Sequence, residues 1–166
     1  GAATFATVPS PRAQVLANFG VGYNHIDADA ARAAGVAVSN TPGAVTDATA
    51  DTAMTLMLMT CRRAGEGERM VRAGTWEGWH PTQLLGFHIS GKTVGIVGMG
   101  RIGKAIAHRC HFGFGMEVVF YNRSPVSDPG MPAHQLSTLA EVMSTADIVV
   151  LAVPATPATH HLIGEQ

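Results

Sequence analysis

One stretch of the chain reads Thr93-Val-Gly-Ile-Val-Gly-Met-Gly-Arg-Ile-Gly-Lys104. Its apolar start, Val94 to Val97, predicts a buried parallel strand, and residues 104–110 have the periodicity of a helix. The glycines between them are spaced G-x-G-x-x-G. In that context the first glycine permits a tight turn, the second lets the backbone approach a pyrophosphate, and the third lets helix and strand pack closely.

The helix after these glycines adds a further property of an anion site, because its N-terminus offers free N–H groups and a partial positive charge. A glycine-rich turn is often only a turn, but this one has a strand before it and a helix after it. The stretch therefore predicts dinucleotide binding, with the cofactor-binding residues Gly98, Gly100, Arg101, Ile102 and Gly103.

Strands and helices continue to alternate after this stretch. The stretch itself is predicted to form a strand over 93–97 and a helix from about 101 to 112. We further predict a strand over Met116–Tyr121, a helix from Leu139 to about Ser144 and a strand over Ile148–Val153. This rhythm is typical of an α/β fold with a Rossmann-type doubly wound parallel sheet. Only three strands are predicted from residue 93 onward, so we expect an incomplete sheet beside the usual arrangement of about six.

The same rhythm precedes the stretch, although residues 1–14 carry little pattern. A short buried strand at Val15–Phe19 and a strand at Val36–Val38 enclose a short helix that ends near Ala34. Asp27 and Asp29 are the alternatives for the N-cap of that helix.

A longer helix is predicted from Asp47, with Thr46 as its cap. Its second half, Ala53–Cys61, is apolar nearly all round, which predicts burial inside a large protein or against a partner, with the methionines as core filling. Residues 75–92 have no clear period and carry two tryptophans, Trp76 and Trp79. We therefore expect a long loop that acts as an arm onto a neighbouring molecule.

Composition excludes several classes of function. The net charge is −1 and no Lys/Arg cluster is present, which argues against nucleic-acid or anionic-membrane binding. No apolar run is long enough to span a bilayer, and no signal peptide or metal site is predicted. The two cysteines, Cys61 and Cys110, both lie in apolar helical patterns, so we expect reduced thiols and a cytoplasmic location.

The choice of cofactor depends on the end of the second predicted strand. An NAD-specific site has an acidic residue about 20 positions after the glycines, where it binds the ribose hydroxyls. Asn122-Arg123-Ser124 occupies that place, so no carboxylate repels a 2′-phosphate. Arg123 can pair with this phosphate and its two neighbours can donate hydrogen bonds to it. The sequence therefore predicts NADP(H) in preference to NAD(H), the alternative being that Arg123 is an ordinary solvated arginine.

Several motifs in fixed order make the chain similar to the D-isomer-specific 2-hydroxyacid dehydrogenase family, and within it to the glyoxylate/hydroxypyruvate reductase branch. Besides the glycine-rich stretch, which extends back to Gly91, they are Asn18-Phe-Gly-Val-Gly-Tyr-Asn-His-Ile-Asp27, Val38-Ser-Asn-Thr-Pro-Gly43, Thr46-Asp-Ala-Thr-Ala-Asp51, Arg72-Ala-Gly-Thr-Trp76, Val153-Pro-Ala-Thr-Pro157 and His160-His-Leu-Ile-Gly164.

The resemblance implies two domains with the active site between them. Residues 1–44 would be the C-terminal part of a flavodoxin-like substrate domain, and 45–166 the N-terminal part of the NAD(P)-binding domain. The interdomain helix and dimerisation arm, about 47–92, would make a homodimer. The resemblance further implies that the amides of Val21 and Gly22 hold the substrate carboxylate, that Thr49 lies beside the nicotinamide, and that Val153 and Pro154 cover the cofactor.

The family's catalytic arginine, carboxylate and histidine would all follow a sequence like His161-Leu-Ile-Gly164. We therefore expect no catalytic residue in this chain, which would be an internal fragment that is inactive alone. The function that the resemblance implies is reduction of a small 2-oxo acid, such as glyoxylate or hydroxypyruvate, by hydride transfer from NADPH. Two alternatives stay open: a dinucleotide-binding interaction protein without catalysis, and a dehydrogenase of the same family for another small acid or anion, such as formate or phosphite.

Overall fold

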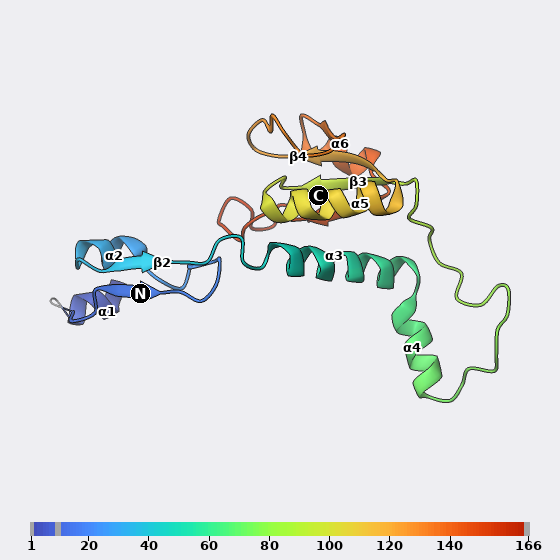
Figure 1. Cartoon of the computed structure of the whole chain (residues 1–166), viewed down its shortest axis with the longest axis horizontal. Coiled ribbons are helices and arrows are strands. Elements are labelled where there is room, and N and C mark those ends of the chain that lie inside the picture. The colour runs from blue at the N-terminus through green and yellow to red at the C-terminus, as the bar shows by residue number, and fades with distance from the viewer. Residues whose placement is uncertain (1, 9–10, 165–166) are drawn as a thin grey trace. The chain divides into compact units, whose positions relative to one another are not determined.

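The computed structural model describes residues 2–8 and 11–164. The chain divides into two compact units, Gly1–Val45 and Thr46–Gln166. Helices and strands alternate in the first unit and, from Thr93 onward, through most of the second (Figure 1).

The first unit contains a two-stranded parallel sheet. Its strands, β1 (Val15–Ala17) and β2 (Ala37–Ser39), pair along their whole length. The helix between them, α2 (Ala28–Ala33), is capped by Asp27, whose side chain accepts a hydrogen bond from the N–H of Ala30 at 2.9 Å. Asp27 and not Asp29 is therefore the N-cap. A helix that the sequence did not predict, α1 (Ala2–Thr7), precedes β1.

The prediction of a buried strand at Val15–Phe19 is wrong in two respects. The strand ends at Ala17, and Val15 and Phe19 are both exposed, at 54% and 103%. A sheet of two strands cannot cover both of its own faces. Within the described residues of this unit, no further layer buries these side chains.

A four-stranded parallel sheet of order β5-β4-β3-β6 forms the centre of the second unit. Its strands are β3 (Thr93–Val97), β4 (Glu117–Tyr121), β5 (His134–Gln135) and β6 (Ile148–Leu151). The Rossmann-type arrangement is thus confirmed, with one strand more than the three predicted. The additional strand, β5, has two residues, which are too few for a period of two to be visible in the sequence.

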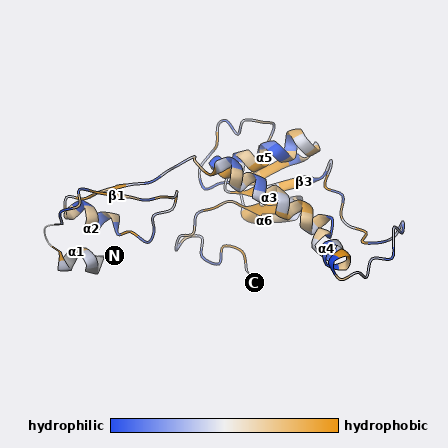
Figure 2. Cartoon of the chain, turned by 60° about the horizontal axis from the view of Figure 1, so that its bottom comes forward, coloured by the Kyte–Doolittle hydropathy of each residue, from blue (hydrophilic) through white to orange (hydrophobic). Residues whose placement is uncertain are grey.

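Helices cover both faces of this sheet. Val94, Ile96, Val118 and Phe120 share a buried cluster with residues of α3 (Thr46–Cys61) and α5 (Arg101–Phe114). The alternate positions of β3 and β4 face α6 (Leu139–Thr145), where Val142 completes a second, smaller cluster. The strands between the two layers are accordingly coloured as hydrophobic in Figure 2.

Helix α3 is buried along one side. Ala50, Met54 and Met57 are buried in the cluster with α5, which confirms that two of the methionines fill the core. Leu56 and Met59 are 61% and 43% exposed. Within the described chain, α5 and the sheet cover one side of α3 only, so burial of its other faces against a partner stays a prediction. The helix also begins at Thr46 itself, one residue earlier than predicted.

After α3 the chain forms α4 (Ala64–Arg72) and then a long loop. Residues 75–92 contain no helix or strand, as predicted, and Trp76 and Trp79 are 53% and 79% exposed. Among the described residues, no helix combines the length and the apolar character needed to cross a bilayer.

Candidate dinucleotide site

The turn between β3 and α5 is built around Gly98, which has a φ of +97°. A Cβ at this position would lie 2.7 Å from the carbonyl oxygen of Ala152, directly after β6. Glycine alone combines the positive φ with such a close approach of two backbones. The tight turn that the glycine pattern predicts is therefore present, and it lies against the end of the neighbouring strand.

The other two glycines of the pattern differ in their surroundings. Gly100 is the N-cap of α5, and a Cβ added there would meet no atom within 4 Å. At Gly103 the added Cβ would lie 2.1 Å from the carbonyl oxygen of Gly98. Gly103 thus lets the helix pack onto the turn, while the backbone at Gly100 is open to a ligand at the helix N-terminus.

The sheet topology places this turn where a parallel sheet binds ligands. Strand order runs from β3 through β4 to β5 on one side, and β6 then pairs with the other side of β3. Ligands of open α/β sheets bind at such a switch point, at the carboxyl ends of the strands. Val153 and Pro154 follow β6 at this edge, and the side chain of Val153 packs against the cluster that contains Val97. The structure therefore brings Gly98 and Val153 together.

Asn122 connects the glycine turn to the segment after β4. Its Oδ1 accepts a hydrogen bond from the N–H of Met99 at 3.2 Å, and its Nδ2 donates to the carbonyl of Ser124 at 2.8 Å. From the sequence, Asn122 is predicted to donate to a 2′-phosphate. Here its amide instead holds two pieces of backbone together.

Arg123 and Ser124 are both exposed. Arg123 forms no ion pair with any described residue, and the N–H groups of Arg123 and Ser124 donate to no described acceptor. A guanidinium and two free amides after the second strand form a donor set suited to a phosphate. No carboxylate occurs between Tyr121 and Val126, so the absence of the ribose-binding acid persists in the structure.

Two residues outside the set predicted from the sequence hold this segment. Gln135 in β5 donates from Nε2 to the carbonyls of Asn122 and Ser124, both at 3.2 Å, and accepts at Oε1 from the N–H of Val126 at 2.9 Å. Lys104 of α5 donates from Nζ to the carbonyl of Asp128. Neither residue has a sequence signal of its own, because each acts through contacts that depend on the tertiary fold.

In the first unit, the loop predicted to hold a carboxylate has its carbonyl groups engaged. Asn18 Nδ2 donates to the carbonyls of Gly20 at 2.9 Å and Gly22 at 3.1 Å, and Asn40 Nδ2 donates to that of Val21 at 2.9 Å. The N–H groups of Val21 and Gly22 donate to no described residue. Both N–H groups are therefore free to donate to a ligand.

The beginning of α3 is fixed to α5 by Arg109. Its guanidinium donates to Asp51 at 2.8 Å, to Asp47 at 3.1 Å and to the carbonyl of Ala105 at 3.0 Å. The hydrogen bond that Arg109 donates to Asp47, followed by its interactions with Asp51, keeps the pKa of Arg109 above its usual value. Thr49 lies between the two aspartates in the sequence and is exposed.

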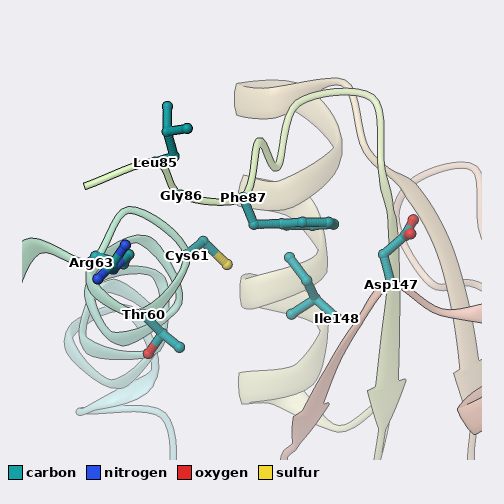
Figure 3. Close-up of a pocket in the computed structure, with 8 residues that line it drawn as sticks. All are labelled: Thr60, Cys61, Arg63, Leu85, Gly86, Phe87, Asp147 and Ile148. Carbon is teal, nitrogen blue, oxygen red and sulfur yellow. The ribbon is translucent and has the colours of Figure 1, made fainter. Parts of the chain in front are cut away.

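A cavity of about 480 Å³ lies near the amino end of β6, whereas the glycine turn lies near the carboxyl end of that strand. It is lined by the end of α3, by Leu85, Gly86 and Phe87 of the long loop, and by Asp147 and Ile148 at the start of β6 (Figure 3). Because it adjoins the first residue of β6 and the glycine turn adjoins the end of that strand, this cavity is not part of the dinucleotide site.

Known proteins match the chain over nearly its full length. The family model "D-isomer specific 2-hydroxyacid dehydrogenase, NAD binding domain" matches residues 54–166. Glyoxylate reductase of Thermococcus gammatolerans is 44% identical over 163 residues, which are 95% of this chain and 48% of that protein. Glycerate dehydrogenase of Hyphomicrobium methylovorum is 38% identical over 90% of this chain and 47% of that protein.

Among solved structures, the holo form of Rhodotorula graminis D-mandelate dehydrogenase superposes with a TM-score of 0.85. It is 32% identical to this chain, and the match covers 98% of this chain and 49% of the other. The chain therefore spans about half the length of the relatives that it matches.

Proposed function

Because the chain belongs to the D-isomer-specific 2-hydroxyacid dehydrogenase family, we propose that the whole protein reduces a small 2-oxo acid to the D-2-hydroxy acid with NADPH. The substrate class is that of glyoxylate and hydroxypyruvate. The relative named glyoxylate reductase supports the first of these substrates.

The observation that carries the choice of cofactor is the segment after β4. It presents Arg123 and two free backbone amides, and it contains no carboxylate. A ribose with a free 2′-hydroxyl would find no acidic acceptor here, whereas a 2′-phosphate would find a cation and donors. NADP(H) is therefore the preferred cofactor in this proposal.

The glycine turn would hold the pyrophosphate of the bound dinucleotide. The open backbone at Gly100 and the first turn of α5, with Arg101 and Ile102, would face that group, and Val153 and Pro154 would cover it from the end of β6. When bound, NADPH supplies the hydride. Thr49 would lie beside the nicotinamide.

The amides of Val21 and Gly22 would bind the substrate carboxylate. Asn18 and Asn40 keep the neighbouring carbonyls turned to their own amides, which leaves N–H groups as the polar groups that meet the anion. We assign the proton donor to none of the described histidines. His25, which follows this loop, and His160 and His161 are all exposed side chains without a described ion pair.

We further propose that the protein is a homodimer and acts in the cytoplasm. Leu56 and Met59 on α3 and Trp76 and Trp79 on the loop are exposed apolar side chains of the kind that interfaces bury. Both cysteines are free thiols, as a reducing compartment would keep them.

The test is NADPH oxidation by the whole protein, followed at 340 nm with glyoxylate, hydroxypyruvate and larger 2-oxo acids, and repeated with NADH. We expect turnover with the small 2-oxo acids and a higher kcat/KM for NADPH. NADPH binding without turnover of any 2-oxo acid would instead support a non-catalytic interaction protein. Turnover with NADP⁺ and formate or phosphite alone would support a different small substrate.

A further inference from the structure

The segment Asn122–Val126 is held by a side chain that lies outside it. The amide of Gln135 contacts three backbone groups of this segment: the carbonyl of Asn122, the carbonyl of Ser124 and the N–H of Val126. The first two carbonyls flank Arg123. One side-chain amide therefore fixes the backbone before and after Arg123 relative to β5.

These contacts also decide which backbone dipoles an anion would meet. A phosphate is repelled by carbonyl oxygens and attracted by N–H groups. Gln135 Nε2 draws the carbonyls of Asn122 and Ser124 toward β5, and Asn122 Nδ2 provides a second donor to the latter. The N–H groups of Arg123 and Ser124 stay free of described acceptors. The segment thus has the polarity of a prepared anion site before any ligand arrives.

We propose that Gln135 is a positioning residue for cofactor selection, whose amide holds residues 122–126 in the shape that presents Arg123 and Ser124 to the 2′-phosphate of NADP(H). This inference rests on the proposed preference for NADP(H). Gln135 does not itself touch the cofactor in this scheme; it acts through the segment that does.

The strand that carries Gln135 does not depend on this side chain. Strand β5 pairs with β4 through backbone groups, with His134 opposite Val119 and Gln135 opposite Phe120, and the N–H of Leu136 donates to the carbonyl of Phe120 at 2.8 Å. Gln135 is itself exposed, so its replacement opens no core cavity. Removal of the amide should therefore disturb the segment and leave the sheet in place.

The experiment compares two ligands that differ only in one phosphate, adenosine 2′,5′-bisphosphate and 5′-AMP. Their Kd values for the whole protein are measured by calorimetry for the wild type and for Gln135→Met, which has similar length but no amide. Gln14→Met is the matched control, because Gln14 is an exposed glutamine of the first unit. We expect Gln135→Met to raise the Kd for the bisphosphate by about tenfold, which is the size of a lost charge-assisted contact. The Kd for 5′-AMP should change by less than about twofold.

A double-mutant cycle tests whether Gln135 acts through the arginine. In an Arg123→Ala background, Gln135→Met should cause little further loss of selectivity, since the group that it positions is already absent. Equal losses in both backgrounds would overturn the proposal. Gln135→Glu serves as a second variant if the methionine variant does not fold; it keeps an acceptor for Val126 but cannot donate to the two carbonyls, so selectivity should fall at least as far.

Two different results distinguish the preference for NADP(H) from the role of Gln135. A wild-type protein that binds both ligands equally would overturn the NADP(H) preference and this inference with it. A wild type that prefers the bisphosphate, together with a Gln135→Met protein that keeps the same preference, would overturn only the role of Gln135.

Discussion

Replacing Gly103 with alanine tests the packing of α5 onto the glycine turn. The new Cβ would lie 2.1 Å from the carbonyl oxygen of Gly98 and 3.2 Å from Cγ2 of Ile96. Carbon and oxygen normally approach to about 3.3 Å. The helix and the turn must therefore separate by about 1 Å, because the obstructing atom belongs to the backbone and cannot rotate away.

The expected destabilisation follows from two opposing terms. Overpacking of this kind costs about 1–3 kcal/mol, and the upper end applies where the contact is with backbone. The better helix propensity of alanine returns up to about 1 kcal/mol. We expect a net loss of about 2 kcal/mol, which for a domain of this size lowers Tm by about 4–8 °C.

Gly113→Ala is the matched control, because it makes the same substitution in the same helix. A Cβ at Gly113 meets no atom within 4 Å, so this variant should be as stable as the wild type or more stable by up to about 1 kcal/mol. Thermal unfolding of the whole protein and titration with ADP-ribose provide the readouts. Equal Tm values for the two variants would refute the reasoning, as would unchanged ADP-ribose binding in a Gly103→Ala protein that unfolds at lower temperature.

Three further predictions concern the cofactor segment, the core thiol and α6. Arg123→Ala should raise the KM for NADPH by about tenfold or more and leave that for NADH nearly unchanged in steady-state assays, and a parallel rise in both would contradict the assigned role. Burial raises the pKa of the Cys110 thiol to about 11, so under native conditions iodoacetamide at pH 8 should modify Cys61 and spare Cys110, as peptide mass spectrometry would show. Because the unfolded thiol ionises at lower pH than the folded one, this group's contribution to stability should be lost as pH rises from about 9 to about 11, whereas a Cys110→Ala protein should lack that component of the pH dependence. Thr138→Ala removes the cap of α6, where the hydroxyl accepts from the N–H of Glu141 at 3.2 Å, and should cost about 1 kcal/mol in thermal unfolding; no change in Tm would mean that the cap does not stabilise the helix.

Sequence patterns that lie within a single helix or strand predicted the helices and strands of the second unit well. Strand β3, helix α5 and helix α6 begin where the apolar periodicity and the glycines place them. The capping box of Thr138 and Glu141 is a local signal of the same kind, because Thr-x-x-Glu before an apolar run marks the start of a helix. Burial was less predictable. Val15 and Leu56 are apolar and yet exposed, because their burial depends on which neighbouring layers cover them and not on their own periodicity.

The candidate site shows the same division between local and tertiary information. The glycine spacing identifies the turn because each glycine answers a steric demand made within a few residues of sequence. The proposed selection of NADP(H) is not local in that sense. Arg123 is visible in the sequence, but the shape of its segment depends on Gln135, which reaches it through the pairing of β5 with β4 across an irregular loop. A sequence with the same Asn-Arg-Ser but another residue at position 135 would lead to the same prediction of NADP(H). Without the contacts of Gln135, we expect it to bind the 2′-phosphate less selectively.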